Sequence, residues 1–149
     1  MLKAKMQKSN LFENGYDVIK SLIKDYVADP TNVYKRKWIY ASMPDLTASK
    51  FAGFPFIVVT SPDISQDDRD FDTNRANTYR FLITIWSDKE SDVDELSSDI
   101  YNILLEHEND LNDESLYNME LSSGPFESEI FNEKTIFSRP LGIVMRGWV

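Results

Sequence analysis

The chain has 149 residues, the usual size of one globular domain, and its 42% hydrophobic and 13% aromatic content excludes an intrinsically disordered protein. It has no cysteine, which excludes a disulfide framework, and no apolar run long enough to predict a signal peptide or a membrane span. Residues 1–50 carry a net charge of +4 and residues 51–149 a net charge of −13, and this acidic bulk argues against a general nucleic-acid-binding protein.

The first predicted element is an amphipathic helix that begins at Asn10 or Leu11 and ends near Val27. Asn10 is a suitable N-cap, and Asp29-Pro30 should end the helix because the residue before a proline avoids the α conformation. Its apolar residues recur at the three- and four-residue spacing of a helix face. They are Phe12, Tyr16, Ile19, Leu22, Ile23 and Tyr26.

The next segments alternate between predicted strands and loops. Short strands are predicted at Trp38–Ala41 and at Phe56–Thr60, and a loop is predicted between them at Ser42–Phe54. The polar and acidic segment Asp63–Asn74 is predicted to be a long connection without regular structure.

Asn77–Trp86 is the clearest predicted strand, because its residues divide into two alternating rows. Both rows are largely apolar, which predicts a central strand covered on both faces, by helices or by a neighbouring subunit. One row is Tyr79, Phe81, Ile83 and Ile85, and the other is Arg80, Leu82, Thr84 and Trp86.

A second amphipathic helix is predicted from Asp92 to Asp110, followed by strands at Leu116–Leu121 and Thr135–Val149. Pro140 in the last strand predicts an edge position or a bulge. The helix stripe consists of Val93, Leu96, Ile100, Ile103, Leu104 and His107. Together these elements predict a single α+β domain, with a mixed, mainly antiparallel sheet and two amphipathic helices packed on one face.

No catalytic, cofactor or metal site is expected. The five glycines do not form a phosphate-binding motif, and the lone His107 is predicted to be a core or boundary residue. The run Asp68, Asp70, Asp72 fails as an EF-hand calcium loop, because Thr73 and Tyr79 occupy the positions of the required glycine and glutamate. These aspartates, with Asp67, are predicted to form a solvated acidic loop, and a weak cation site is the alternative.

Interface residues are the more promising prediction. Trp86 and Arg80 lie opposite the Tyr79/Phe81 row, and tryptophan and arginine are typical of interface anchors. Three residues of the last strand are further candidates of the same kinds: Arg139, Arg146 and Trp148. The basic cluster Lys35-Arg36-Lys37 is predicted to be a solvated strand edge or an interface, with an anion contact as the alternative.

The order of elements resembles a known family. The residues that carry the resemblance are F-P-F-I-V-V at 54–59, I-W-S-D at 85–88, V-D-E-L-S-S-D-I-Y-N-I-L-L at 93–105 and R-P-L-G-I-V-M-R-G-W-V at 139–149. This pattern is similar to the tail terminator or tail-completion proteins of long-tailed viruses of bacteria and archaea, and more loosely to their head–tail joining proteins. The resemblance spans residues 8–149, except that residues 29–53 do not match strand for strand.

The resemblance implies a structural virion protein that assembles as a homo-oligomeric ring, expected to be a hexamer, at the head-proximal end of the tail tube. Its implied partners are the tail tube protein and a neck or head-completion protein, with DNA passing through but not tightly bound, and with no membrane or cofactor involved. The implied location is the virion, after assembly in the host cytoplasm. The alternatives are a head-completion or connector protein, a cytosolic ligand-binding regulatory domain, and a divalent-metal enzyme that uses the aspartates.

Overall fold

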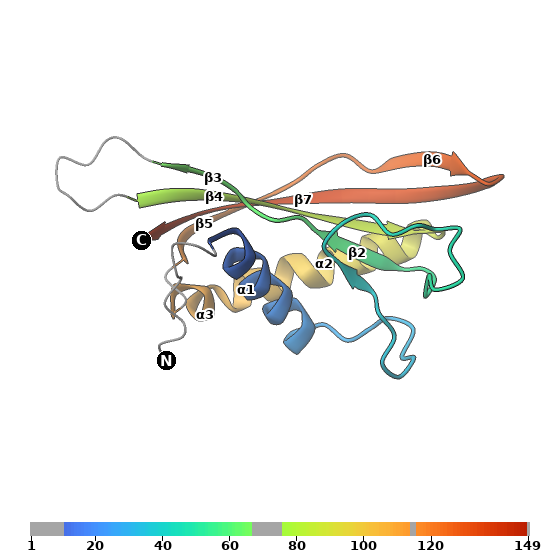
Figure 1. The fold of residues 1–149 in the computed structure, drawn as a ribbon, viewed down its shortest axis with the longest axis horizontal. Coiled ribbons are helices and arrows are strands. Elements are labelled where there is room, and N and C mark those ends of the chain that lie inside the picture. Colours follow the sequence, from blue (N-terminus) through green and yellow to red (C-terminus); the bar gives the residue numbers. More distant parts are fainter. Residues whose placement is uncertain (1–10, 67–75, 114–115, 149) are drawn as a thin grey trace.

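The computed structural model describes residues 11–66, 76–113 and 116–148. The predicted α+β class is confirmed: a mixed, mostly antiparallel sheet carries the helices on one face (Figure 1). The elements follow in the order α1 (Leu11–Tyr26), β1 (Ile39–Tyr40), β2 (Phe56–Val59), β3 (Asp63–Gln66), β4 (Ala76–Ser87), α2 (Glu90–Glu106), α3 (Glu108–Asp113), β5 (Leu116–Ser123), β6 (Glu127–Phe131) and β7 (Lys134–Trp148).

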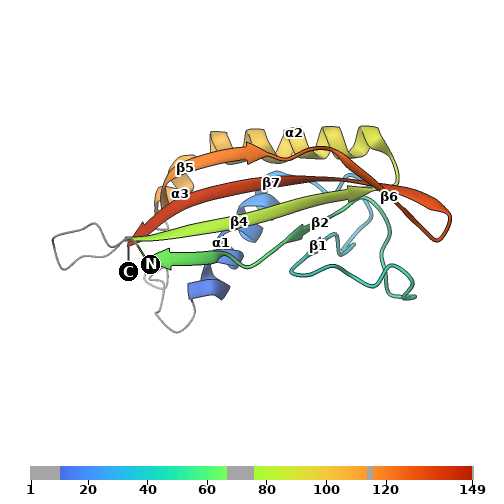
Figure 2. The same cartoon turned by 90° about the horizontal axis from the view of Figure 1, so that it is seen from above.

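Two long antiparallel strands, β4 and β7, form the centre of the sheet and pair continuously from Ala76↔Trp148 to Ser87↔Phe137. The edge of β4 that faces away from β7 pairs with β3 along one part of its length and with β2 along another. In the same way, the edge of β7 that faces away from β4 pairs with β5 and with β6. β1 extends the sheet beyond β2 in parallel (Figure 2). Each long strand is therefore flanked by two short ones, with a break between them.

The core lies between the sheet and the helices. α2 packs across β4 and β7, and α1 packs against α2 and β2. The predicted row Tyr79, Phe81, Ile83, Ile85 is fully or almost fully buried. The same holds for Ile19, Leu22 and Ile23 of the first predicted helix stripe and for Val93, Leu96, Ile100 and Leu104 of the second, whereas Tyr26 is 48% exposed. Burial of apolar surface at about 25 cal/mol per Å² is the main stabilising contribution of this layer.

Gly15 has a packing role in α1. A Cβ atom at this position would lie 2.9 Å from Cγ of Pro62 and 3.3 Å from Cε1 of Phe81. The missing side chain thus lets the helix approach the connection between β2 and β3, which offsets the cost of a glycine inside a helix.

One prediction about the middle of the chain was wrong. Asp63–Gln66 is strand β3 and not part of a loop, because its main chain pairs with Asn77–Arg80 and such pairing does not require apolar side chains. The rest of the predicted acidic connection, including Asp67, Asp68, Asp70 and Asp72, lies outside the described residues. The second face of β4 carries no helix among the described residues, and Leu82 on that face is 43% exposed. Cover by a neighbouring subunit, the other predicted possibility, stays a prediction.

Two further corrections concern the C-terminal half. The helix predicted to reach Asp110 ends at Glu106, and after His107 (φ −109°, ψ 24°) a short α3 begins. β7 is a central strand, so Pro140 marks neither an edge nor a bulge. The carbonyl of Pro140 accepts a hydrogen bond from the Gly124 N–H (2.8 Å), so the proline nitrogen also faces the break between β5 and β6. A missing N–H is tolerated there because no outer strand requires it.

Candidate assembly surfaces

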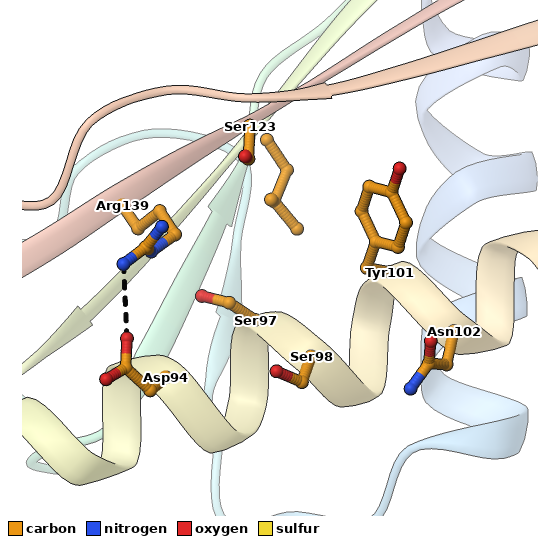
Figure 3. Close-up of a pocket in the computed structure, with 8 residues that line it drawn as sticks. Asp94, Ser97, Ser98, Tyr101, Asn102, Ser123 and Arg139 are labelled. Atoms are coloured by element: carbon orange, nitrogen blue, oxygen red, sulfur yellow. Dashed lines mark hydrogen bonds and ion pairs between the residues drawn. The ribbon is translucent and has the colours of Figure 1, made fainter.

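A groove runs between α2 and the strands β5 and β7 (Figure 3). Arg139 enters it from β7, because its partner Ile85 belongs to the row of β4 that faces the helices. Nη2 of Arg139 donates to Oδ1 of Asp94 on α2 at 3.2 Å, and the guanidinium carbon lies 5.7 Å from the ring centroid of Phe126. The remaining lining residues are Ser97, Ser98, Tyr101, Asn102, Ser123 and Leu141.

The groove has the chemistry of a binding surface. Its polar groups are hydroxyls, one amide, one guanidinium and one carboxylate, and the Asp94 carboxylate is mostly exposed. The buried atoms Oγ of Ser97 and Nε of Arg139 have no hydrogen-bond partner among the described residues, and such atoms cost about 1–3 kcal/mol unless a water or another molecule satisfies them. Across residues 11–66, 76–113 and 116–148, no three His, Cys, Asp or Glu side chains are grouped to hold a metal ion.

The second surface is the face of the sheet opposite the helices. Arg80 and Arg146 project from this face, since the register places them in the row that alternates with the buried one. Nη1 of Arg80 donates to Oγ of Ser65 on β3 at 3.1 Å. With Leu82 exposed between polar neighbours, this face is a mixed surface of the kind found in non-obligate interfaces.

Trp86 lies at one end of the same face, but its own chain covers it in part. Its ring stacks on Phe56 with centroids 6.4 Å apart, and Phe51 and Phe54 from the preceding loop pack against Phe56. Trp86 therefore belongs partly to the core. Trp148 pairs with Ala76 at the end of β7.

The structure thus separates the predicted interface residues. Arg80, Trp86 and Arg146 share the open face of the sheet, whereas Arg139 lies on the helix side. Their role at an interface stays a prediction. Sequence reasoning missed Asp94, the partner of Arg139 in the groove. The two residues lie 45 positions apart, and only the packing of α2 on the sheet brings them together.

The predicted basic cluster divides into one buried and two exposed residues. The Arg36 side chain is only 4% exposed and forms a bidentate ion pair with Asp29, with both N–O distances at 2.9 Å. It also donates to the carbonyls of Gly53 (2.9 Å) and Pro55 (2.6 Å). Burial raises the pKa of Asp29, but the hydrogen bonds from Arg36 and from Thr31 outweigh it and hold the pKa below its usual value.

His107 is a boundary residue, as predicted. Its ring stacks on Tyr26 at 3.7 Å between centroids, and Nδ1 lies 3.0 Å from Oδ2 of Asp110. The ring follows the last residue of α2 and contributes to the α1–α2 contact.

The comparisons with known proteins bear on the fold. No protein-family model matches the sequence, and no curated protein matches it. A chain in the structure described as the virion of a native gene transfer agent (GTA) particle does match in three dimensions, with a TM-score of 0.54. The match covers 90% of this chain and 94% of the virion chain, at 10% sequence identity. The two chains share a fold.

This similarity spans almost the whole of both chains, so the sheet and its helices match as one unit. At 10% identity, it establishes the architecture alone. No described helix is long and apolar enough to cross a bilayer.

Proposed function

We propose that this chain is a non-catalytic structural virion protein, a tail terminator ring subunit that closes the head-proximal end of a tail tube and joins it to the neck. The observation that carries the proposal is the fold shared with a chain of the GTA virion over nine-tenths of this chain. The resemblance of residues 54–59, 85–88, 93–105 and 139–149 to tail terminators points to the same class of protein.

The surfaces suit a ring subunit. A ring subunit that joins a tube to a neck must offer different surfaces to different partners. The α2 groove and the open sheet face differ in their residues and lie on opposite sides of the sheet, so each is available to a different partner. The net charge of −13 over residues 51–149 disfavours tight binding of DNA that passes through the ring, since phosphate contacts need clustered lysine and arginine.

Deletion of the gene distinguishes this proposal from its rivals. A terminator deletion should give DNA-filled heads without tails, together with tubes of uncontrolled length in electron micrographs. Unjoined tails of normal length would instead favour the head-completion or connector alternative. Normal infectious particles, together with tight DNA binding by the purified protein, would refute a structural role.

A direct assembly test uses the purified chain. Sedimentation and negative-stain imaging, with and without purified tail tubes, should reveal rings either free or at tube ends. The variant Leu82→Asp changes an exposed position and should leave folding intact. Loss of rings in this variant would show that the open sheet face takes part in assembly. A protein that forms no ring under either condition would contradict the proposal.

A further inference from the structure

The β6–β7 hairpin projects beyond the body of the sheet. The last residue of β4, Ser87, pairs with Phe137, so the tip of the hairpin continues past the end of β4 (Figure 1). Asn132 and Glu133 close it with positive φ angles of 49° and 65°, as in a tight two-residue hairpin turn. A well-defined turn gives the hairpin a fixed shape.

This hairpin carries three glutamates, one lysine (Lys134) and an exposed apolar side chain, so its net charge is negative. Glu127, Glu129 and Glu133 are exposed, and none forms an ion pair with a described residue. Ile130 is 79% exposed, which is unusual for an isoleucine in a folded protein. An acidic, partly apolar projection calls for a basic, partly apolar partner surface.

Such a surface exists elsewhere on the same chain. Four lysines line a concavity of about 440 Å³ between α1 and the segment that leads into β1, together with Arg36, Trp38 and Ile39. The four are Lys20, Lys24, Lys35 and Lys37. We call these four lysines, with Tyr34, the basic surface. Tyr34 is 85% exposed, and Lys35 Nζ lies 5.3 Å from its ring centroid.

The positive charge of the basic surface is not neutralised within the described chain. Arg36 turns inward to Asp29, which leaves its neighbours Lys35 and Lys37 facing outward. No described carboxylate lies within ion-pair distance of any of the four lysines. Four cations grouped on a protein of net charge −9 create a local field that attracts an acidic partner.

We propose that the acidic hairpin of one copy docks on the basic surface of the next copy, which makes the lateral contact of the assembly. Side chains alternate along β6, so Glu127 and Glu129 lie on one face of the hairpin and Ile130 on the other. A hairpin seated in the concavity therefore engages both of its walls: the glutamates approach the lysines through charge complementarity, and Ile130 approaches Tyr34, the other most exposed large apolar side chain of the described residues. The tip of the β6–β7 hairpin and helix α1, which carries Lys20 and Lys24, lie apart in both views of the fold, so one copy does not satisfy itself (Figures 1 and 2).

A contact between two different surfaces of identical copies is heterologous and closes into a ring if the rotation permits. The inference rests on the proposed ring function and adds which surfaces make the contact. The α2 groove and the open sheet face then remain free for the tube and the neck.

Cross-linking tests the contact directly, because the chain has no native cysteine. One batch carries Ile130→Cys and another carries Tyr34→Cys, and the two are mixed and treated with a short bis-maleimide. We expect a cross-linked pair made of one copy from each batch, with a yield that falls as salt is raised from about 0.05 to 0.5 M, because salt screens exposed charges. Leu105→Cys, at an exposed apolar position of α2, is the matched control and should not cross-link to Tyr34→Cys.

Charge reversal supplies the second arm. The hairpin variant Glu129→Lys/Glu133→Lys and the surface variant Lys35→Glu/Lys37→Glu should each weaken self-association about tenfold or more, since two to four ion pairs become repulsive. A mixture of the two variants should restore association between unlike copies. Circular dichroism checks that each variant is folded.

The outcomes separate this inference from the proposed function. Rings that form without a cross-link between Ile130→Cys and Tyr34→Cys, and that tolerate both reversals, would overturn the docking contact and leave the ring function standing. A chain that neither forms rings nor cross-links, alone or on tail tubes, would overturn both. Protection of Tyr34→Cys by duplex DNA, lost in Lys35→Glu/Lys37→Glu, would overturn the docking contact in favour of a nucleic-acid surface.

Discussion

Replacement of Arg36 by methionine tests the buried anchor beside the basic surface. Methionine fills the space of the arginine stem but lacks every donor. The change removes two hydrogen bonds to Asp29 and three to the carbonyls of Ala52, Gly53 and Pro55. It also leaves the Asp29 carboxylate, only 13% exposed, without its cation.

The expected cost is about 3–5 kcal/mol, the range for removing one partner of a buried ion pair. Removing one partner of an exposed ion pair would cost about 1 kcal/mol or less. The larger range applies here because the Arg36 side chain is only 4% exposed. Against a total stability of about 5–15 kcal/mol, this is a large loss. At about 2–4 °C per kcal/mol for a domain of this size, the melting temperature should fall by about 6–20 °C.

Urea unfolding monitored by circular dichroism measures the loss, with Lys35→Met as the control. Lys35 is adjacent and exposed, so its replacement should change the free energy of unfolding by less than about 0.5 kcal/mol. The double variant Arg36→Met/Asp29→Asn should recover part of the loss, because it removes the unpaired charge. If Arg36→Met costs no more than Lys35→Met, the anchor is not formed as described.

Three further changes probe the core, the ion pair and the strand break. Ile83→Asp should abolish folding, because it buries an unpaired carboxylate at a position with no exposed surface. The adjacent Leu82→Asp, at an exposed position, should melt near the wild-type temperature. Unchanged melting of both variants would refute the assignment of the buried face of β4. Because the folded pKa of Asp29 is lowered, its stabilising contribution is present above its unfolded pKa of about 4 and is lost as pH falls through the folded value. The stability gap between wild type and Asp29→Asn, measured by urea unfolding from pH 6 to pH 3, should therefore narrow at acid pH, and a constant gap would contradict the lowered pKa. Gly124→Ala should cost about 1–3 kcal/mol in the same assay, because the added Cβ overlaps the rigid ring of Pro140, and a neutral effect would mean that the β5–β6 break can open freely.

Sequence periodicity determined the layers of this protein. The alternation of Tyr79, Phe81, Ile83 and Ile85 and the three- and four-residue spacing of the helix stripes both follow from local geometry, so the buried sides could be read directly. The same patterns predicted one mainly antiparallel sheet with helices on one face. Strand β3 escaped prediction because it is stabilised by main-chain pairing, and Ile64 is its one apolar side chain.

Pairing partners were decided by tertiary structure alone. Pro140 is compatible with a central strand only because β5 and β6 leave a break beside it, and that break is a property of three strands together. Arg36 is one of three equivalent cations in the sequence, but the fold places Asp29 and three carbonyls around it and directs its neighbours outward.

For the surfaces too, the sequence determined some properties and the fold determined others. The sequence alone established the residue types, the acidic excess after residue 50 and the absence of cysteine, and these exclude disulfide chemistry and disfavour DNA binding. Alternation along the last strand already places Arg139 and Arg146 on opposite faces. Only the fold showed that Arg80 shares the face of Arg146, because the register between β4 and β7 sets that relation. It also gathered lysines from α1 and from residues 35–37 around one concavity, because long-range packing brings together charges that the chain keeps apart.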